Sequence, residues 1–300
     1  MWAYVQNRVG GPEVLERVEV PRPEPGAGEV LVRVAATSVN AADAKVRAGV
    51  LDKLGAPPFV LGLDVAGVVE SAGAGVEGLG PGTRVFGMVF GGANAEFVVA
   101  PAALLAPVPD ALPLTRAAAL PVAGLTAVQL MAGVRAGDRV LVHAAAGGVG
   151  HLAVQVAARR GAYVVGTARP DNHAFLRALG ANELIDHRAT DFTAVVSDLD
   201  VVADLVATPE HLERSLTTLG PHGRLLAADG PDTHPDPRFH RFFVAPGAVA
   251  LTALAAAVTA GELRVAERVL PIADLPEAHR LADTGRIRGK LVLAVAGIDG

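Results

Sequence analysis

The sequence contains no cysteine, which excludes disulfide bonds, thiolate metal sites and cysteine nucleophiles. Aromatic residues are few, with nine Phe, two Tyr and one Trp in 300 residues, so the core must be built mainly from Ala, Val and Leu. Positive charge is not in excess either, because the formal net charge is −5. The composition therefore gives no electrostatic reason for binding nucleic acid.

Long apolar runs are also missing. The longest candidate, residues 245–260, is rich in Ala but is interrupted by Pro246, Gly247 and two Thr, and it is too short to cross a bilayer comfortably. We expect a buried helix there. The first residues lack a basic segment followed by an apolar run, so they do not resemble a signal peptide. The sequence thus predicts a cytoplasmic protein without a membrane partner.

What is present indicates a globular fold with two domains. Hydrophobic residues make up 51% and charged residues 19%, a balance that excludes a disordered chain. A chain of 300 residues also exceeds the usual size of one domain. Residues 1–106 contain many short apolar stretches separated by Gly and Pro, which favours a β-rich, barrel-like domain.

The pattern changes in residues 107–246, where apolar strands alternate with helices, as in a doubly wound parallel sheet. The predicted strands there are residues 138–143, 163–167, 183–186, 200–206, 223–228 and 241–244. Residues 247–300 end in a predicted strand that would return to the first domain and complete it. The predicted fold class is α/β, with a discontinuous β-rich domain (1–106 and 247–300) and a parallel-sheet domain (107–246).

The segment that carries the most chemistry is His143-Ala-Ala-Ala-Gly-Gly-Val-Gly150, between a predicted strand and a predicted helix. Exposed amide groups at a helix start, together with the helix dipole, favour a phosphate. The dinucleotide fingerprint is Gly-x-Gly-x-x-Gly, and its first position here is Ala, so the match is partial and a plain tight turn is the alternative. The predicted pyrophosphate contacts are Ala145, Gly147, Gly148, Val149 and Gly150.

The end of the second predicted strand indicates which dinucleotide binds. NAD-binding proteins usually place Asp or Glu there, whereas this chain has Gly166-Thr-Ala-Arg169. Because a guanidinium matches a phosphate bidentately, we predict NADPH, with Thr167 and Arg169 contacting the 2′-phosphate. His173 and His187 are additional candidate contacts. The alternative is that Arg169 is a solvated loop charge and that both histidines lie on the surface.

With these elements in place, the chain resembles the medium-chain dehydrogenase/reductase superfamily, and most of all its zinc-free quinone oxidoreductase branch. The segments that carry the likeness, in family order, are residues 10–15, 25–34, 38–43, 62–67, 121–127, 144–150 and 289–293. The resemblance implies a GroES-like catalytic domain interrupted by a Rossmann domain, with a cleft between them for nicotinamide and substrate. It also implies a homodimer, and an edge strand near Phe242 is a candidate for pairing across a two-fold axis.

The resemblance also implies that no metal takes part. Zinc-dependent relatives hold their catalytic metal with Cys, His and an acidic residue, and the matching positions here are Asn40, Leu63 and Asp64. Asn and Leu are poor zinc ligands, and one carboxylate cannot hold the ion. Chemistry without a metal suits an acceptor that needs little polarisation, such as a quinone or a conjugated enone.

By motif, Asn40 and Asp43 would line the substrate side, where Asn40 would donate to a carbonyl oxygen as negative charge develops. Thr126 would contact the nicotinamide or its ribose, and Phe243 and Val244 match a segment whose backbone often meets the carboxamide. The alternatives are a turn-stabilising Asn40, a helix-capping Asp43 and a Phe243 that belongs to the core. No proton donor is evident, so solvent is the expected source of the proton.

The leading hypothesis is therefore NADPH-dependent reduction of a small-molecule quinone or enone. The alternatives are an enoyl reductase acting on a polyketide or acyl-thioester intermediate, and a non-catalytic NADPH-binding sensor or structural protein. A basic entry would favour a carrier-bound substrate, but we interpret Arg286, Arg288 and Lys290 as a solvated run of tail charges. Lys45 and Arg47 are likewise interpreted as solvated.

Overall fold

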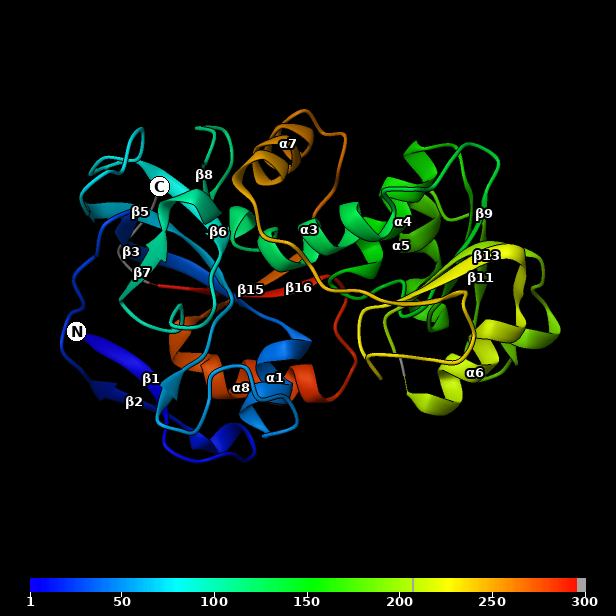
Figure 1. Cartoon of the computed structure of the whole chain (residues 1–300), viewed down its shortest axis with the longest axis horizontal. Coiled ribbons are helices and arrows are strands. Elements are labelled where there is room, and N and C mark those ends of the chain that lie inside the picture. Colours follow the sequence, from blue (N-terminus) through cyan, green and yellow to red (C-terminus); the bar gives the residue numbers. More distant parts are fainter. Residues whose placement is uncertain (207, 296–300) are drawn as a thin grey trace. The chain divides into compact units, whose positions relative to one another are not determined.

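The computed structural model describes residues 1–206 and 208–295 and divides into two compact units (Figure 1). Unit 1 comprises Met1–Leu125 and Pro246–Gly300, and unit 2 comprises Thr126–Ala245. The first boundary falls after residue 125, whereas the sequence placed it after residue 106. The segment before it stays with unit 1 because β8 (Leu105–Pro107) pairs with β6 (Arg84–Met88), and α2 (Leu114–Ala117) packs on the same sheet.

Unit 1 is built from a three-stranded and a seven-stranded sheet. Its other elements are β1 (Trp2–Gln6), β2 (Leu15–Glu19), β3 (Glu29–Val39), α1 (Ala41–Arg47), β4 (Phe59–Val60), β5 (Asp64–Ala72), β7 (Phe97–Pro101), α7 (Ala248–Thr259), β15 (Glu267–Pro271), α8 (Leu275–Asp283) and β16 (Lys290–Ala294). The larger sheet has the order β15-β16-β3-β5-β6-β8, with β7 also paired to β3. The C-terminal strand therefore lies in the same sheet as strands from the first hundred residues.

One helix of unit 1 corrects a sequence-based expectation. The apolar segment 245–260 forms α7, which buries Leu251, Leu254 and Ala255 but leaves Val249 87% exposed. It is therefore a helix with one buried face, so the expectation of a buried helix holds for that face only. No helix in the described residues is both long and apolar enough to span a bilayer.

Unit 2 is a six-stranded sheet in which every neighbouring pair is parallel, with the order β11-β10-β9-β12-β13-β14. Its elements after α3 (Pro121–Leu130) are β9 (Arg139–Val142), α4 (Gly150–Arg159), β10 (Tyr163–Thr167), α5 (His173–Ala178), β11 (Glu183–Ile185), β12 (Leu199–Asp204), α6 (Pro209–Thr217), β13 (Leu219–Ala227) and β14 (Phe239–Arg241). This is the strand order of a Rossmann fold, and the order reverses at β9. The predicted class, a β-rich unit with a doubly wound parallel sheet, is confirmed.

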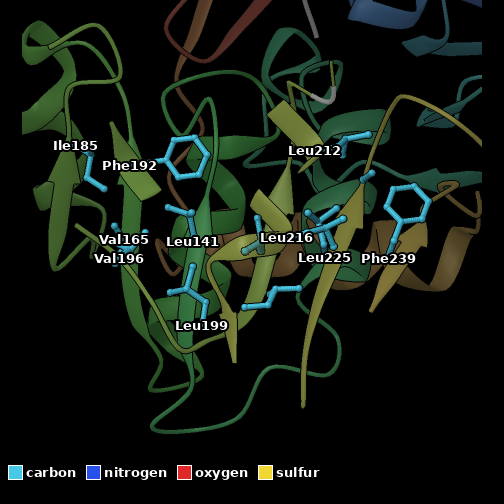
Figure 2. Close-up of a cluster of buried hydrophobic side chains, with 13 residues drawn as sticks. Leu141, Val165, Ile185, Phe192, Val196, Leu199, Leu212, Leu216, Leu225 and Phe239 are labelled. Carbon is cyan, nitrogen blue, oxygen red and sulfur yellow. The ribbon is translucent and has the colours of Figure 1, made fainter. Parts of the chain in front are cut away.

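The hydrophobic core of unit 2 holds the strands of the parallel sheet in register. Figure 2 shows Leu141 of β9, Val165 of β10 and Leu225 of β13 together with Leu212 and Leu216 of α6. All five are almost fully buried. Because side chains in such a core are close-packed, the carboxyl ends of β9 and β10 are held at fixed positions. The connections that leave those ends carry the predicted cofactor residues.

Candidate functional site

The glycine turn connects β9 to α4. Ala144 has a positive φ of 47°, and Gly147 closes the turn by donating its N–H to the Ala144 carbonyl at 2.9 Å. A Cβ atom at Gly150 would lie 2.4 Å from the Ala144 oxygen and 2.7 Å from the Ala145 Cα, closer than such atoms approach. Only glycine therefore fits at position 150, where the helix starts against the turn.

The N-terminus of α4 is open. Its N-cap, Val149, has no side-chain acceptor, and the backbone N–H groups of Gly148 and Val149 have no hydrogen-bond acceptor within the described residues. Unpaired N–H groups and the dipole of a ten-residue helix attract an anion. The turn thus offers the donors that a pyrophosphate requires, next to the end of β9.

Thr167, at the end of β10, holds the glycine turn in place by accepting hydrogen bonds from two of its backbone N–H groups. Its hydroxyl accepts the Ala144 N–H at 3.3 Å and lies 3.1 Å from His143 Nδ1, while its carbonyl accepts the Ala145 N–H at 3.0 Å. His143 Nε2 in turn lies 3.2 Å from the hydroxyl of Ser215 on α6. Thr167 is buried by these contacts. The structure therefore gives it a role in holding the turn that the sequence did not indicate.

Arg169 follows β10 by two residues and is half-buried. Its guanidinium has no acceptor in the part of the chain that the structure describes. His173 Nε2 instead lies 3.1 Å from the Ala168 carbonyl, and His187 is exposed in the turn after β11. Of the three basic side chains predicted near the 2′-phosphate, Arg169 alone combines a permanent charge with unpaired donors.

The nicotinamide candidates lie on α3 and on the segment after β14. Thr126 is buried on α3, and one turn later the amide of Gln129 pairs with the backbone of Ala245, with N–O distances of 2.7 and 2.9 Å. This pair fixes the segment that contains Phe243 and Val244. Phe243 is 61% exposed, with the Arg241 guanidinium 4.7 Å from its ring centre, so it does not belong to the core.

The residues of unit 1 predicted to lie on the substrate side meet where β3 ends and β5 and β16 begin. β3 runs antiparallel to both β5 and β16, pairing Ser38 with Asp64 and Val39 with Leu291. The end of β3 therefore lies beside the first residues of β5 and β16. That register brings Asn40, Asp64 and Lys290 together from distant parts of the sequence.

Asp64 is fully buried and accepts hydrogen bonds at both oxygens. Its Oδ2 accepts from the Ser38 hydroxyl, from Asn40 Nδ2 at 2.8 Å and from Lys290 Nζ at 3.2 Å. Its Oδ1 accepts the Val122 N–H at the start of α3, at 2.7 Å. These four hydrogen bonds leave the carboxylate little capacity for another partner.

Asp43 forms a capping box with Asn40 at the start of α1. Its Oδ2 accepts the Asn40 N–H at 2.9 Å, and its Oδ1 accepts the Gly62 N–H at 3.1 Å. Burial, opposed by these hydrogen bonds, raises the pKa of Asp43 to about 6. The helix-capping alternative considered for this residue is therefore what the structure shows.

Two cations interpreted as solvated are buried, so that interpretation is wrong. Lys290 is 3% exposed and pairs with Asp64. Arg47 is 4% exposed, donates to Asp283 at 2.7 Å and lies 2.9 Å from His279 Nδ1. Their partners lie more than 200 positions away along the chain, which is why local sequence did not indicate them.

Two buried histidines predict loss of stability in acid. Desolvation lowers the pKa of His143 and of His279 to about 3, so the unfolded chain binds their protons below pH 6.5 while the folded chain does not. Asp43 has the opposite effect, because its pKa is raised in the folded state and the folded chain therefore binds its proton first as the pH falls through about 6. We expect the net free energy of unfolding to fall by about 2 kcal/mol between pH 7 and pH 5, measured by urea denaturation. His279→Gln should reduce this change in the free energy of unfolding with pH, whereas replacing the exposed His222 should not. An equal change in the two variants would contradict the assignment of the effect to the buried histidines.

The comparisons with known proteins agree with this architecture. The alcohol dehydrogenase GroES-like domain family matches residues 26–110, and the zinc-binding dehydrogenase family matches residues 179–293. The quinone oxidoreductase of Rattus norvegicus is 34% identical over 72% of this chain and 69% of its own length. The spectinabilin polyketide synthase protein NorB of Streptomyces orinoci is 37% identical over 95% of this chain, which spans only 14% of that protein.

Solved structures show the same relationship. The quinone oxidoreductase of Coxiella burnetii superimposes with a TM-score of 0.91 at 34% identity, covering 98% of this chain and 99% of that one. The Escherichia coli quinone oxidoreductase, solved with NADPH, gives 0.91 at 26% identity, with 98% and 100% covered. The chain belongs to the medium-chain dehydrogenase/reductase superfamily, in its quinone oxidoreductase branch. Unit 2 has the strand order of a dinucleotide-binding domain, as expected for a member of that superfamily.

The zinc in one family description does not fit the residues of this chain. Of the three positions that match zinc ligands, Leu63 has no donor atom. Asn40 Oδ1 and Asp64 Oδ2 accept hydrogen bonds from the Lys290 ammonium, and Asp64 Oδ1 accepts the Val122 N–H. The described residues also contain no cluster of three or more His, Asp or Glu side chains suited to a metal ion.

Proposed function

We propose that this protein reduces a quinone or a conjugated enone with NADPH and without a metal ion. The observation that carries the choice of cofactor is the unpaired guanidinium of Arg169, two residues after β10. The end of β10 itself carries no Asp or Glu. A carboxylate there would accept from ribose hydroxyls, whereas a guanidinium pairs with a 2′-phosphate. The similarity to an oxidoreductase solved with NADPH supports the same choice.

In this proposal the residues of unit 2 bind and orient the cofactor. Gly148 and Val149 donate their N–H groups to the pyrophosphate, Arg169 binds the 2′-phosphate, and Thr126 with the segment at Phe243 contacts the nicotinamide end. His173 and His187 are secondary candidates for the phosphate. When bound, NADPH supplies a hydride from nicotinamide C4.

The residues of unit 1 stabilise the reduced acceptor. Asn40 donates a hydrogen bond to the carbonyl oxygen as negative charge develops on it, and Asp43 holds the Asn40 backbone in place. One hydride and one proton then complete the reduction, and we propose that the proton comes from solvent. The similarity to quinone oxidoreductases supports acceptors that need no metal to polarise them.

The test is a panel of quinones, enones and enoyl thioesters, with NADPH oxidation followed by absorbance after dialysis against a chelator. The proposal expects turnover with quinones or enones that is unaffected by the chelator. Tight NADPH binding without oxidation by any acceptor would contradict an enzymatic role and favour a non-catalytic NADPH-binding protein.

A second candidate function is enoyl reduction of a polyketide or acyl-thioester intermediate. It is favoured by the 37% identity to a stretch of a polyketide synthase protein. The same panel separates the two functions, because a carrier-dependent enzyme should prefer the enoyl thioester over a free enone by a large factor in kcat/KM.

We also propose that two copies of the chain associate through β14. This strand pairs only with β13 in the described chain and so leaves a free parallel-sheet edge. Size-exclusion chromatography with light scattering should give twice the mass of one chain. A monomeric mass at micromolar concentration would contradict the proposal.

A further inference from the structure

The Lys290 ammonium lies among the side chains that occupy the zinc-ligand positions of metal-dependent relatives. It donates to the Val39 carbonyl at 3.1 Å, to Asn40 Oδ1 at 2.6 Å and to Asp64 Oδ2 at 3.2 Å. These three bonds use all three N–H groups of an ammonium. Lys290 therefore has no donor left for a substrate, and any effect it has on the reaction must act through the residues it holds.

Asn40 is the residue most constrained by this contact. Its Oδ1 accepts from Lys290, and one N–H of its Nδ2 donates to Asp64 at 2.8 Å. The opposite orientation of the amide would place its NH₂ group against an ammonium and its oxygen against a carboxylate. The two buried charges thus determine which end of the amide points inward.

One donor of Asn40 is left over. An amide nitrogen carries two N–H groups, and within the described part of the chain only one of those on Nδ2 has an acceptor. Asn40 retains 9% exposure, whereas Asp64 retains none. The second N–H of Asn40 therefore remains available as a donor to a bound molecule.

We propose that Lys290 is a positioning residue that fixes the Asn40 amide as a hydrogen-bond donor to the carbonyl oxygen of the acceptor. Its charge also polarises the amide, because a cation on Oδ1 withdraws electron density and strengthens the N–H as a donor. The inference rests on the proposed reduction of a quinone or enone. It extends that function because it assigns the support of the Asn40 donor to a buried cation that pairs with Asp64 at the start of β5.

The test is a double-mutant cycle with Asn40→Ala and Lys290→Met, using the fastest enone of the acceptor panel. Removing a donor to a developing oxyanion lowers kcat by about 100-fold, which is the effect expected for Asn40→Ala. Lys290→Met should lower kcat by about tenfold, since the amide remains bonded to Asp64 but its oxygen loses the ammonium that orients it. Because Lys290 acts through Asn40, the double variant should be no slower than Asn40→Ala alone.

Controls separate this role from general damage to the fold. Lys53→Met makes the same chemical change at an exposed lysine and should leave kcat unaltered. The dissociation constant of NADPH should be unaltered in Lys290→Met. If that variant is too unstable to assay, Lys290→Met combined with Asp64→Asn removes both buried charges together and should show the same loss of kcat.

The outcomes distinguish this inference from the function on which it rests. If the wild-type protein fails to oxidise NADPH with every acceptor of the panel, the proposed function and this inference are both overturned. An active wild type with an unaltered Lys290→Met variant would overturn the inference alone. Multiplicative losses in the double variant would also overturn it, because they would show that Lys290 does not act through Asn40.

Discussion

Replacing Gly150 with alanine is expected to abolish high-affinity cofactor binding, with a loss of at least about 100-fold, or about 2.7 kcal/mol. The added Cβ would lie 2.4 Å from the Ala144 oxygen and 2.7 Å from the Ala145 Cα, both backbone atoms that cannot rotate away. The start of α4 would have to shift, and the N–H groups proposed to bind the pyrophosphate would shift with it. Fluorescence titration with NADPH measures the effect.

Two other glycines provide a graded control. A Cβ at Gly147 would lie 3.3 Å from the Ala144 oxygen, which requires a shift of only a few tenths of an ångström. At Gly80 it would meet nothing within 4 Å. Gly80→Ala should therefore leave the NADPH affinity unchanged. Gly147→Ala should lower it slightly, and Gly150→Ala should lower it most. A folded Gly150→Ala protein that binds NADPH like the wild type would show that the pyrophosphate lies elsewhere.

The second large effect is expected for Arg169→Ala. A hydrogen-bonded charge pair with a phosphate contributes about 1.5–3 kcal/mol, so NADPH affinity should fall by about 10- to 100-fold. NADH has no 2′-phosphate, and its affinity should hardly change. The guanidinium has no other partner among the described residues, so its removal breaks no contact within the fold.

Arg135→Ala is the matched control for Arg169→Ala. Arg135 is exposed and precedes β9, so it lies at the amino end of the parallel strands, whereas cofactors bind at the carboxyl end. Its removal should change neither affinity. Equal losses of NADPH and NADH affinity in Arg169→Ala would refute the assignment of this residue to the 2′-phosphate.

The parallel sheet of unit 2 could be predicted because its signals are local. Apolar strands alternate with helices, and the strand predicted for residues 163–167 coincides with β10. The last strand was predicted at residues 241–244 but lies at Phe239–Arg241, since a short edge strand beside a Pro-rich loop has a weak pattern. In unit 1, β1 and β2 were not predicted, and α1, which has only seven residues, was considered only as the helix that Asp43 would cap.

The interior of the candidate site could not be predicted, because its contacts join distant segments. The charge run around Lys290 has the pattern of a solvated tail, and only the antiparallel register of β16 with β3 turns Lys290 toward Asp64. The resemblance to the family did indicate Asn40. The structure adds the two partners that orient its amide, Asp64 and Lys290, which the residues around Asn40 in the sequence do not reveal. The bonds from His143 to Thr167 and Ser215 were missed for the same reason.

The most direct test of the account is the ratio of the NADH and NADPH dissociation constants of the wild-type protein, measured by titration at low salt. A half-buried guanidinium with unpaired donors and no carboxylate in its place predicts that NADPH binds at least about tenfold more tightly. Equal affinities, or tighter binding of NADH, would contradict the central claim that this end of the sheet recognises a 2′-phosphate.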